Sequence, residues 1–121
     1  MKSRAVLLIV LVAFACREKY DAARDAALKD NLFQMRKAIE NYRADHGTYP
    51  PSLDALVPNY IRKIPADPIT RETNWRVTTE ESVQPSADFT TGTAAAASAV
   101  VVEVHSAAPG SDRDGVPYAN Y

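Results

Sequence analysis

The feature that most constrains this chain is a long stretch that contains no helix breaker. Neither proline nor glycine occurs from Arg17 to His46. Within this stretch, apolar residues recur at the spacings that place them on one face of a helix: Leu28, Leu32, Met35, Ile39 and Tyr42. The pattern predicts a helix over residues 17–46 that buries these five side chains, with Gly47 as its left-handed stop.

The predicted helix is long for the protein that carries it. At about 1.5 Å per residue it spans roughly 40 Å, more than a domain built from a chain of 121 residues needs. We therefore expect its first part, residues 18–27, to protrude and the rest to pack on the domain. The charged residues between the apolar positions fit a solvated face: Lys29, Asp30, Arg36, Lys37, Glu40 and Arg43.

The sequence after this helix alternates between proline-containing turns and short apolar segments. An extended segment over 48–51 leads to a short helix that Ser52 can N-cap, with inward-facing Leu53, Leu56 and Val57. Residues 75–78 and 98–105 have strand patterns, and 80–97 is predicted to be a loop.

The C-terminal tail over 107–121 is rich in turn residues, and we expect Tyr118 and Tyr121 to attach it to the sheet. The fold class is therefore α+β, a long N-terminal helix packed on a small antiparallel sheet. The chain divides into an N-terminal segment over 1–16 and one domain over 17–121.

The N-terminal segment has the organisation of a secretory signal. Lys2 and Arg4 precede an apolar run over 5–15, whose length of about eleven residues suits a signal peptide better than a membrane span of about 20. The run ends at Cys16, before the charged residues 17–19, and so resembles the lipobox of bacterial lipoproteins. We expect cleavage before Cys16 and lipid attachment to it; the alternative is a membrane-embedded free thiol.

Charge and motif content argue against two functional classes. Lys and Arg total 14 and Asp and Glu total 15, a net charge of -1 without a basic run, so nucleic-acid binding is not expected. The sequence has no paired histidines at metal-binding spacing, no Cys-x-x-Cys and no glycine-rich phosphate loop. His46 and His105 lack a nucleophile in a suitable context, so we predict no catalytic residues and no enzymatic activity.

Two motifs carry a resemblance to a known family. Residues 45–50 read Asp-His-Gly-Thr-Tyr-Pro, and residues 64–68 read Ile-Pro-Ala-Asp-Pro. Together with the order of elements, they resemble the major pseudopilins of bacterial type II secretion, which have the type IV pilin-like fold. The motif residues in this chain are Gly47, Tyr49, Pro50, Pro65, Asp67 and Pro68.

The resemblance implies a structural subunit in the bacterial cell envelope. Such subunits are anchored in the membrane by the N-terminus, face the periplasm, and stack helix against helix with other subunits into a short fibre for protein export. The expected partners are therefore the membrane, copies of the same chain, and other pseudopilin or secretion-system subunits.

The N-terminal segment departs from that family, whose members begin with a short leader and carry a Glu within a long apolar span. Residues 1–16 show neither feature. Either the true start lies upstream, or the pilin-type segment has been exchanged for a lipoprotein-type signal, which we favour. A second functional hypothesis follows, in which a stand-alone lipoprotein uses a pilin-like domain for binding or scaffolding.

The resemblance also implies a calcium site in the C-terminal loop. The candidate ligands are Asp112 and Asp114, with Ser111, although Pro109 stands where the related loop tends to carry Asp. Calcium takes six to eight oxygen ligands, so backbone carbonyls and water would have to complete the set. The alternative is that the protein binds no cofactor and Asp112 caps a polar turn at 110–111.

Overall fold

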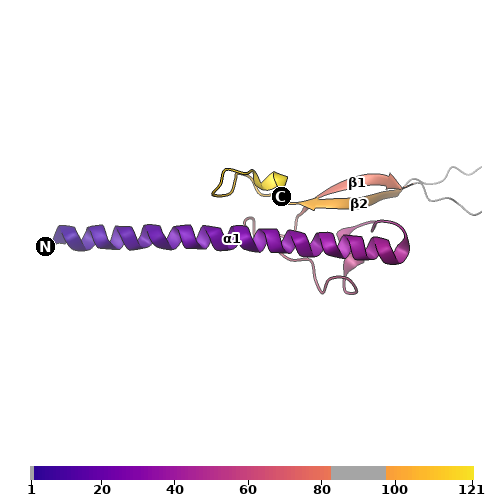
Figure 1. Cartoon of the computed structure of the whole chain (residues 1–121), viewed down its shortest axis with the longest axis horizontal. Helices are drawn as coiled ribbons and strands as arrows, with labels where there is room; N and C mark the ends of the chain where they lie inside the picture. The colour runs from indigo at the N-terminus through magenta and orange to yellow at the C-terminus, as the bar shows by residue number, and fades with distance from the viewer. Residues whose placement is uncertain (1, 83–97) are drawn as a thin grey trace, which may run out of the picture.

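The computed structural model describes residues 2–82 and 98–121, with side-chain surroundings for 19–81 and 98–121. One long helix, α1 (Lys2–His46), packs on a two-stranded antiparallel sheet, which is an α+β arrangement (Figure 1). The strands are β1 (Arg76–Ser82) and β2 (Ser98–His105), and two short 3₁₀ helices, η1 (Leu53–Leu56) and η2 (Tyr118–Asn120), lie in the connections.

Helix α1 is continuous over 45 residues, so it begins well before the predicted start at residue 17. No proline or glycine precedes Gly47, and nothing in the backbone chemistry interrupts the helix at residue 16. Gly47 ends the helix at φ +72°, and its N–H donates to the carbonyl of Arg43 at 2.8 Å. In the described part of the chain, no helix carries an apolar stretch long enough to cross a bilayer.

The core lies along one stripe of α1. Leu28, Leu32, Met35 and Ile39 are buried, on the face that the spacing predicts, and Tyr42 is half-buried against them. Residues from the connection after α1 and from β2 complete the cluster: Leu56, Trp75, Val101 and Val104. The sheet and the connection after the helix therefore share a single apolar surface on α1.

Strand β2 lies on α1, and β1 is the outer strand of the sheet (Figure 1). Their antiparallel register pairs Thr78 with Glu103 and Thr79 with Val101, so Val102 is the extra residue of a bulge in β2. The bounds of β2 agree with the predicted strand over 98–105.

The prediction for β1 was wrong at both ends. The strand starts one residue after Trp75 and continues to Ser82. Glu80 and Glu81, predicted to lie in a loop, pair with Val100 and Ala99. A partner strand satisfies their backbone groups, which overrides the weak strand propensity of glutamate. The rest of the predicted loop, 83–97, lies outside the described residues.

The short helix after residue 52 is a single 3₁₀ turn. Leu56 is fully buried, while Leu53 and Val57 are half-buried. The predicted N-cap was wrong, because the Ser52 side chain makes no capping hydrogen bond.

Contact between α1 and the domain begins nearer to the N-terminus than predicted. Arg24 donates from Nε to the carbonyl of Pro68 at 3.0 Å and from Nη2 to the carbonyl of Ile69 at 2.9 Å. Asp25 is buried, so contact with the domain begins at Arg24 and not at Leu28. These contacts are polar, and apolar periodicity does not report them.

The face assigned to solvent also needs one correction. Arg36 is half-buried: its Nη2 donates to the carbonyl of Val104 at 3.0 Å, and its Nε pairs with the carboxylate of Glu103. A long side chain on the flank of the apolar stripe thus reaches over the edge of the helix to β2.

Truncation of Ile39 tests the phase of the helix. Ile39→Ala should lower the free energy of unfolding of the full chain by about 2–5 kcal/mol, because the buried side chain leaves a cavity. Lys37→Ala is the control, since Lys37 is exposed on the same helix. Equal, small changes for both variants in denaturant unfolding would contradict the assigned core face.

Candidate functional site

The Ile-Pro-Ala-Asp-Pro segment that contains Asp67 forms a buried junction. The carboxylate is 1% exposed; its Oδ1 accepts the N–H of Ile69 at 2.7 Å and that of Thr70 at 3.3 Å. Its Oδ2 accepts the hydroxyl of Ser106 at 2.5 Å, and Ser106 Oγ accepts the N–H of Ala108 at 3.0 Å. Asp67 therefore joins the turn after Pro68 to the segment that follows β2.

The motif at the end of α1 also connects elements. Tyr49 lies beneath the guanidinium of Arg43, with 4.7 Å between the carbon Cζ and the ring centroid. Pro50 is buried, and its carbonyl accepts the N–H of Val101 at 2.8 Å, which anchors the chain to β2 directly after the helix.

Pro65 fixes the start of the sheet in the same way. Its carbonyl accepts the indole N–H of Trp75 at 2.8 Å. The next carbonyl, of Ala66, accepts the side-chain amide of Asn31 on α1 at 3.1 Å. The motif residues therefore connect α1, the segment that follows it and the sheet. The connections are hydrogen bonds to backbone carbonyl groups and to the buried carboxylate of Asp67.

Neither histidine lies in a catalytic arrangement. His46 stacks on Tyr42 with ring centroids 4.0 Å apart, and its Nδ1 lies 3.3 Å from the hydroxyl of Tyr60. His105 donates from Nδ1 to the carbonyl of Tyr121 at 2.8 Å. The described contacts of the two rings include no serine or cysteine, and the absence of catalysis stays a prediction.

Asp112 organises the C-terminal loop. Its Oδ1 accepts the N–H of Asp114 and of Val116, each at 2.9 Å. Its Oδ2 accepts the hydroxyl of Tyr121 and lies 3.9 Å from Nζ of Lys29 on α1. The same ammonium stands 4.6 Å from the centroid of the Tyr121 ring. Asp112 thus caps a turn at Asp114 and Val116, and not at residues 110–111 as the alternative to a calcium site had it.

These contacts set the ionisation of the loop. The hydroxyl of Tyr121, then the two backbone N–H groups and Lys29, hold the pKa of Asp112 below 3.8, although burial opposes them. The Tyr121 hydroxyl likewise raises the pKa of Lys29 above 10.5, with burial acting the other way. Burial, followed by the hydrogen bond to Asp25, raises the pKa of Tyr118 to about 12.

The loop geometry does not fit a calcium ion. A hollow of about 190 Å³ between α1 and the loop is lined by three carboxylates, Asp25, Asp112 and Asp114, but also by Lys29 and Arg113. Both oxygens of Asp112 already receive donors, and the ammonium of Lys29 supplies positive charge beside them. Among the described side chains, no group of three or more His, Cys, Asp or Glu could hold a metal. Asp112 instead caps a polar turn over residues 114–116, and the absence of a cofactor stays a prediction.

The tail attaches to α1 as well as to the sheet. Tyr118, which was expected to contact the sheet, donates its hydroxyl to Asp25 on α1 at 2.9 Å, across 93 positions of sequence. Tyr121 contacts the sheet through His105. Sequence reasoning missed Asp25 and Lys29 as partners of the tail, because no local pattern marks contacts of such separation.

Cys16 lies inside α1, but its side chain is outside those described. Lipid attachment therefore stays a prediction.

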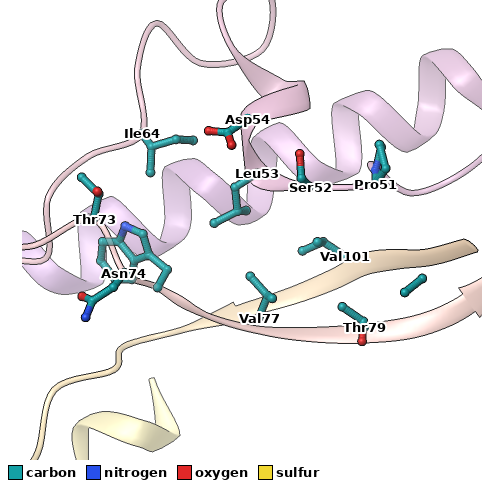
Figure 2. Close-up of a pocket in the computed structure, with 12 residues that line it drawn as sticks. Pro51, Ser52, Leu53, Asp54, Ile64, Thr73, Asn74, Val77, Thr79 and Val101 are labelled. Carbon is teal, nitrogen blue, oxygen red and sulfur yellow. The ribbon is translucent and has the colours of Figure 1, made fainter.

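A second concave surface lies between the connection and the sheet. This groove, of about 360 Å³, is bounded on one side by Pro51, Ser52, Leu53 and Asp54. Val77 and Thr79 of β1 point toward it from the other side (Figure 2). Its floor is apolar, with Trp75, Ile64 and Val101, and it holds no cluster of titratable groups.

Comparisons with known proteins do not extend this description. No protein-family model matches the chain, and neither the curated proteins nor the solved structures give a match.

The shifted pKa of Asp112 predicts a pH dependence. A folded pKa below the unfolded value means that the carboxylate contributes stability above about pH 4, which is lost as the pH falls through the folded pKa. The unfolding temperature of Asp112→Asn should thus lie below that of the wild type at neutral pH and approach it in acid. Asp114→Asn, an exposed control, should follow the wild type. A constant difference from neutral pH down to about pH 2 would contradict this assignment.

Proposed function

We propose that this chain is a pseudopilin-like structural subunit of a type II secretion or type IV pilus-like system, acting in protein export. The observation that carries the proposal is the length of α1 relative to the domain. At about 1.5 Å per residue the helix is roughly 68 Å long, and the described contacts with the domain begin at Arg24. A helix that projects far beyond its domain is suited to packing against other helices.

The hydrogen bonds made by the two motifs support the same proposal. Gly47, Pro50 and Asp67, from the two motifs that carry the resemblance, hold the domain on the C-terminal part of α1. Such a domain can transmit force along the helix, because its attachments are hydrogen bonds to buried or half-buried groups and not a flexible linker. In this proposal the domain faces the periplasm and the N-terminal segment anchors it to the membrane.

One exposed side chain marks a contact surface for helix stacking. Phe33 is 64% exposed, and its position on α1 lies opposite the buried stripe. Ala26 is also exposed on this side of the helix and leaves room for a neighbouring backbone. Residues of this kind favour helix–helix contacts, since small side chains permit close approach and an aromatic ring buries a large area.

Export in the native host tests the function. Deletion of the chain should stop the release of secreted proteins into the medium, and the wild-type chain should restore it. Phe33→Glu should fail to restore release while it unfolds at the wild-type temperature, because it alters only the exposed face of α1. Arg62→Ala, an exposed control in the connection outside α1, should restore release. Normal release in the deletion strain would refute the proposal.

A stand-alone lipoprotein is the second candidate function, and Cys16 is the observation that favours it. The apolar run over 5–15 ends at this cysteine and is followed at once by charged residues. In this proposal lipid chains on Cys16 hold the protein on a membrane, and the domain serves as a binding or scaffolding module.

Intact mass measurement decides the state of Cys16. The membrane-extracted protein should begin at Cys16 and carry the mass of the attached lipid, and Cys16→Ser should remove that mass. An unmodified N-terminus at Met1 would refute lipid attachment and leave an uncleaved anchor. The export experiment is independent of this result, so the two candidate functions are tested separately.

A further inference from the structure

The outer strand of the sheet has an unpaired edge. β1 pairs with β2 on one side, and no backbone hydrogen bond within the described residues covers its other side. β2, in contrast, lies on α1, and its Val101 N–H donates to the carbonyl of Pro50. An open edge presents a row of N–H and C=O groups to any strand that can align with it.

The backbone of β1 is regular along this edge. The bulge of the sheet lies in β2, at Val102, so the alternation of side chains in β1 is unbroken. Val77 and Thr79 point toward the groove (Figure 2). Arg76, Thr78 and Glu80 therefore share the opposite face of the strand.

Two opposite charges on that face lack partners. Arg76 and Glu80 are exposed, and neither makes an ion pair or side-chain hydrogen bond in the part of the chain that the structure describes. They stand at equal distances on either side of Thr78. Glu103, which lies opposite Thr78 in β2, is by comparison paired with Arg36 of α1.

We propose that β1 pairs with β1 of a second copy of this chain, antiparallel and about a two-fold axis through Thr78. The axis places Arg76 opposite Glu80 of the second copy and Glu80 opposite its Arg76. Thr78 meets Thr78, and Val77 meets Thr79 on the groove face. The two sheets become one sheet in which β1 is no longer an edge.

The charges select this register over its neighbours. A two-fold axis perpendicular to the sheet keeps each residue on its own face, so the register can shift only by moving the axis to another residue. Centring on Thr79 places Thr78 against Glu80, and centring on Glu80 places two like charges together, which destabilises strand pairs. Charged residues on an edge strand often serve to prevent pairing with another chain, and for that role they need no particular arrangement. Arg76 and Glu80, in contrast, are placed so that each meets an opposite charge when a second copy is added.

A disulfide trap tests the register in the full chain, with Cys16→Ser to remove the native thiol. Directly opposed residues lie about 4.5–5.5 Å apart between Cα atoms, inside the disulfide range of about 4.4–6.8 Å. Thr78→Cys should therefore form a disulfide-linked dimer under mild oxidation. Thr73→Cys is the matched control: it is an exposed threonine outside β1, far from the axis, and should stay monomeric.

Charge reversal in the Thr78→Cys chain tests the partner. Arg76→Glu and Glu80→Arg should each abolish the dimer, because each places like charges opposite each other twice. Mixing the two differently tagged variants should restore a disulfide between them, since the mixed pair has opposite charges at both positions. A monomeric Thr78→Cys chain, equal linking of the Thr73→Cys control, or dimers that ignore charge reversal would overturn the proposal.

Discussion

The structure depends on one apolar stripe of α1. Leu28, Leu32, Met35 and Ile39 form one continuous apolar surface, and both later parts of the chain pack on it. A two-stranded sheet is marginal in water without such support. The sheet therefore forms because β2 can bury Val101 and Val104 against the helix. The helix in turn ends where that support ends, at Gly47.

Two buried carboxylates hold the loops that the apolar core does not fix. Asp67 and Asp112 each accept two backbone N–H groups and one hydroxyl. Burial of a carboxylate is unfavourable unless its oxygens are satisfied, and in both cases they are. Each carboxylate closes one loop and ties it to a distant segment. Irregular loops thereby hold fixed positions beside a small core.

Local signals account for the part of the fold that the sequence predicts. The face of α1 and the bounds of β2 follow from apolar spacing and from a run of valines, which are properties of neighbouring residues. Polar contacts over long separations were missed, as with Arg24 and Asp25 on the part of the helix expected to protrude. β1 was predicted too short for the same reason, since its glutamates become strand residues only when β2 lies beside them.

The candidate site was predictable in its residues but not in its roles. Asp67 and Asp112 stand out in the sequence as motif residue and candidate ligand. Only the geometry shows that Asp67 connects a turn to the segment after β2. It also shows that Asp112 lies beside the ammonium group of Lys29 on α1. A long helix carries a small domain at its C-terminal end, and hydrogen bonds of the two motifs and of the C-terminal loop fix the domain there. This arrangement underlies the proposal of a pseudopilin-like subunit.

Hydrogen exchange of the full chain tests most directly whether helix and sheet form one cooperative unit. The amides of Leu32, Met35 and Ile39 should exchange with the same free energy of opening as those of Val101 and Val104, because both groups become exposed only when the shared core is lost. Fast exchange in β2 beside slow exchange in α1 would contradict the account, since it would show that the helix is stable without the sheet.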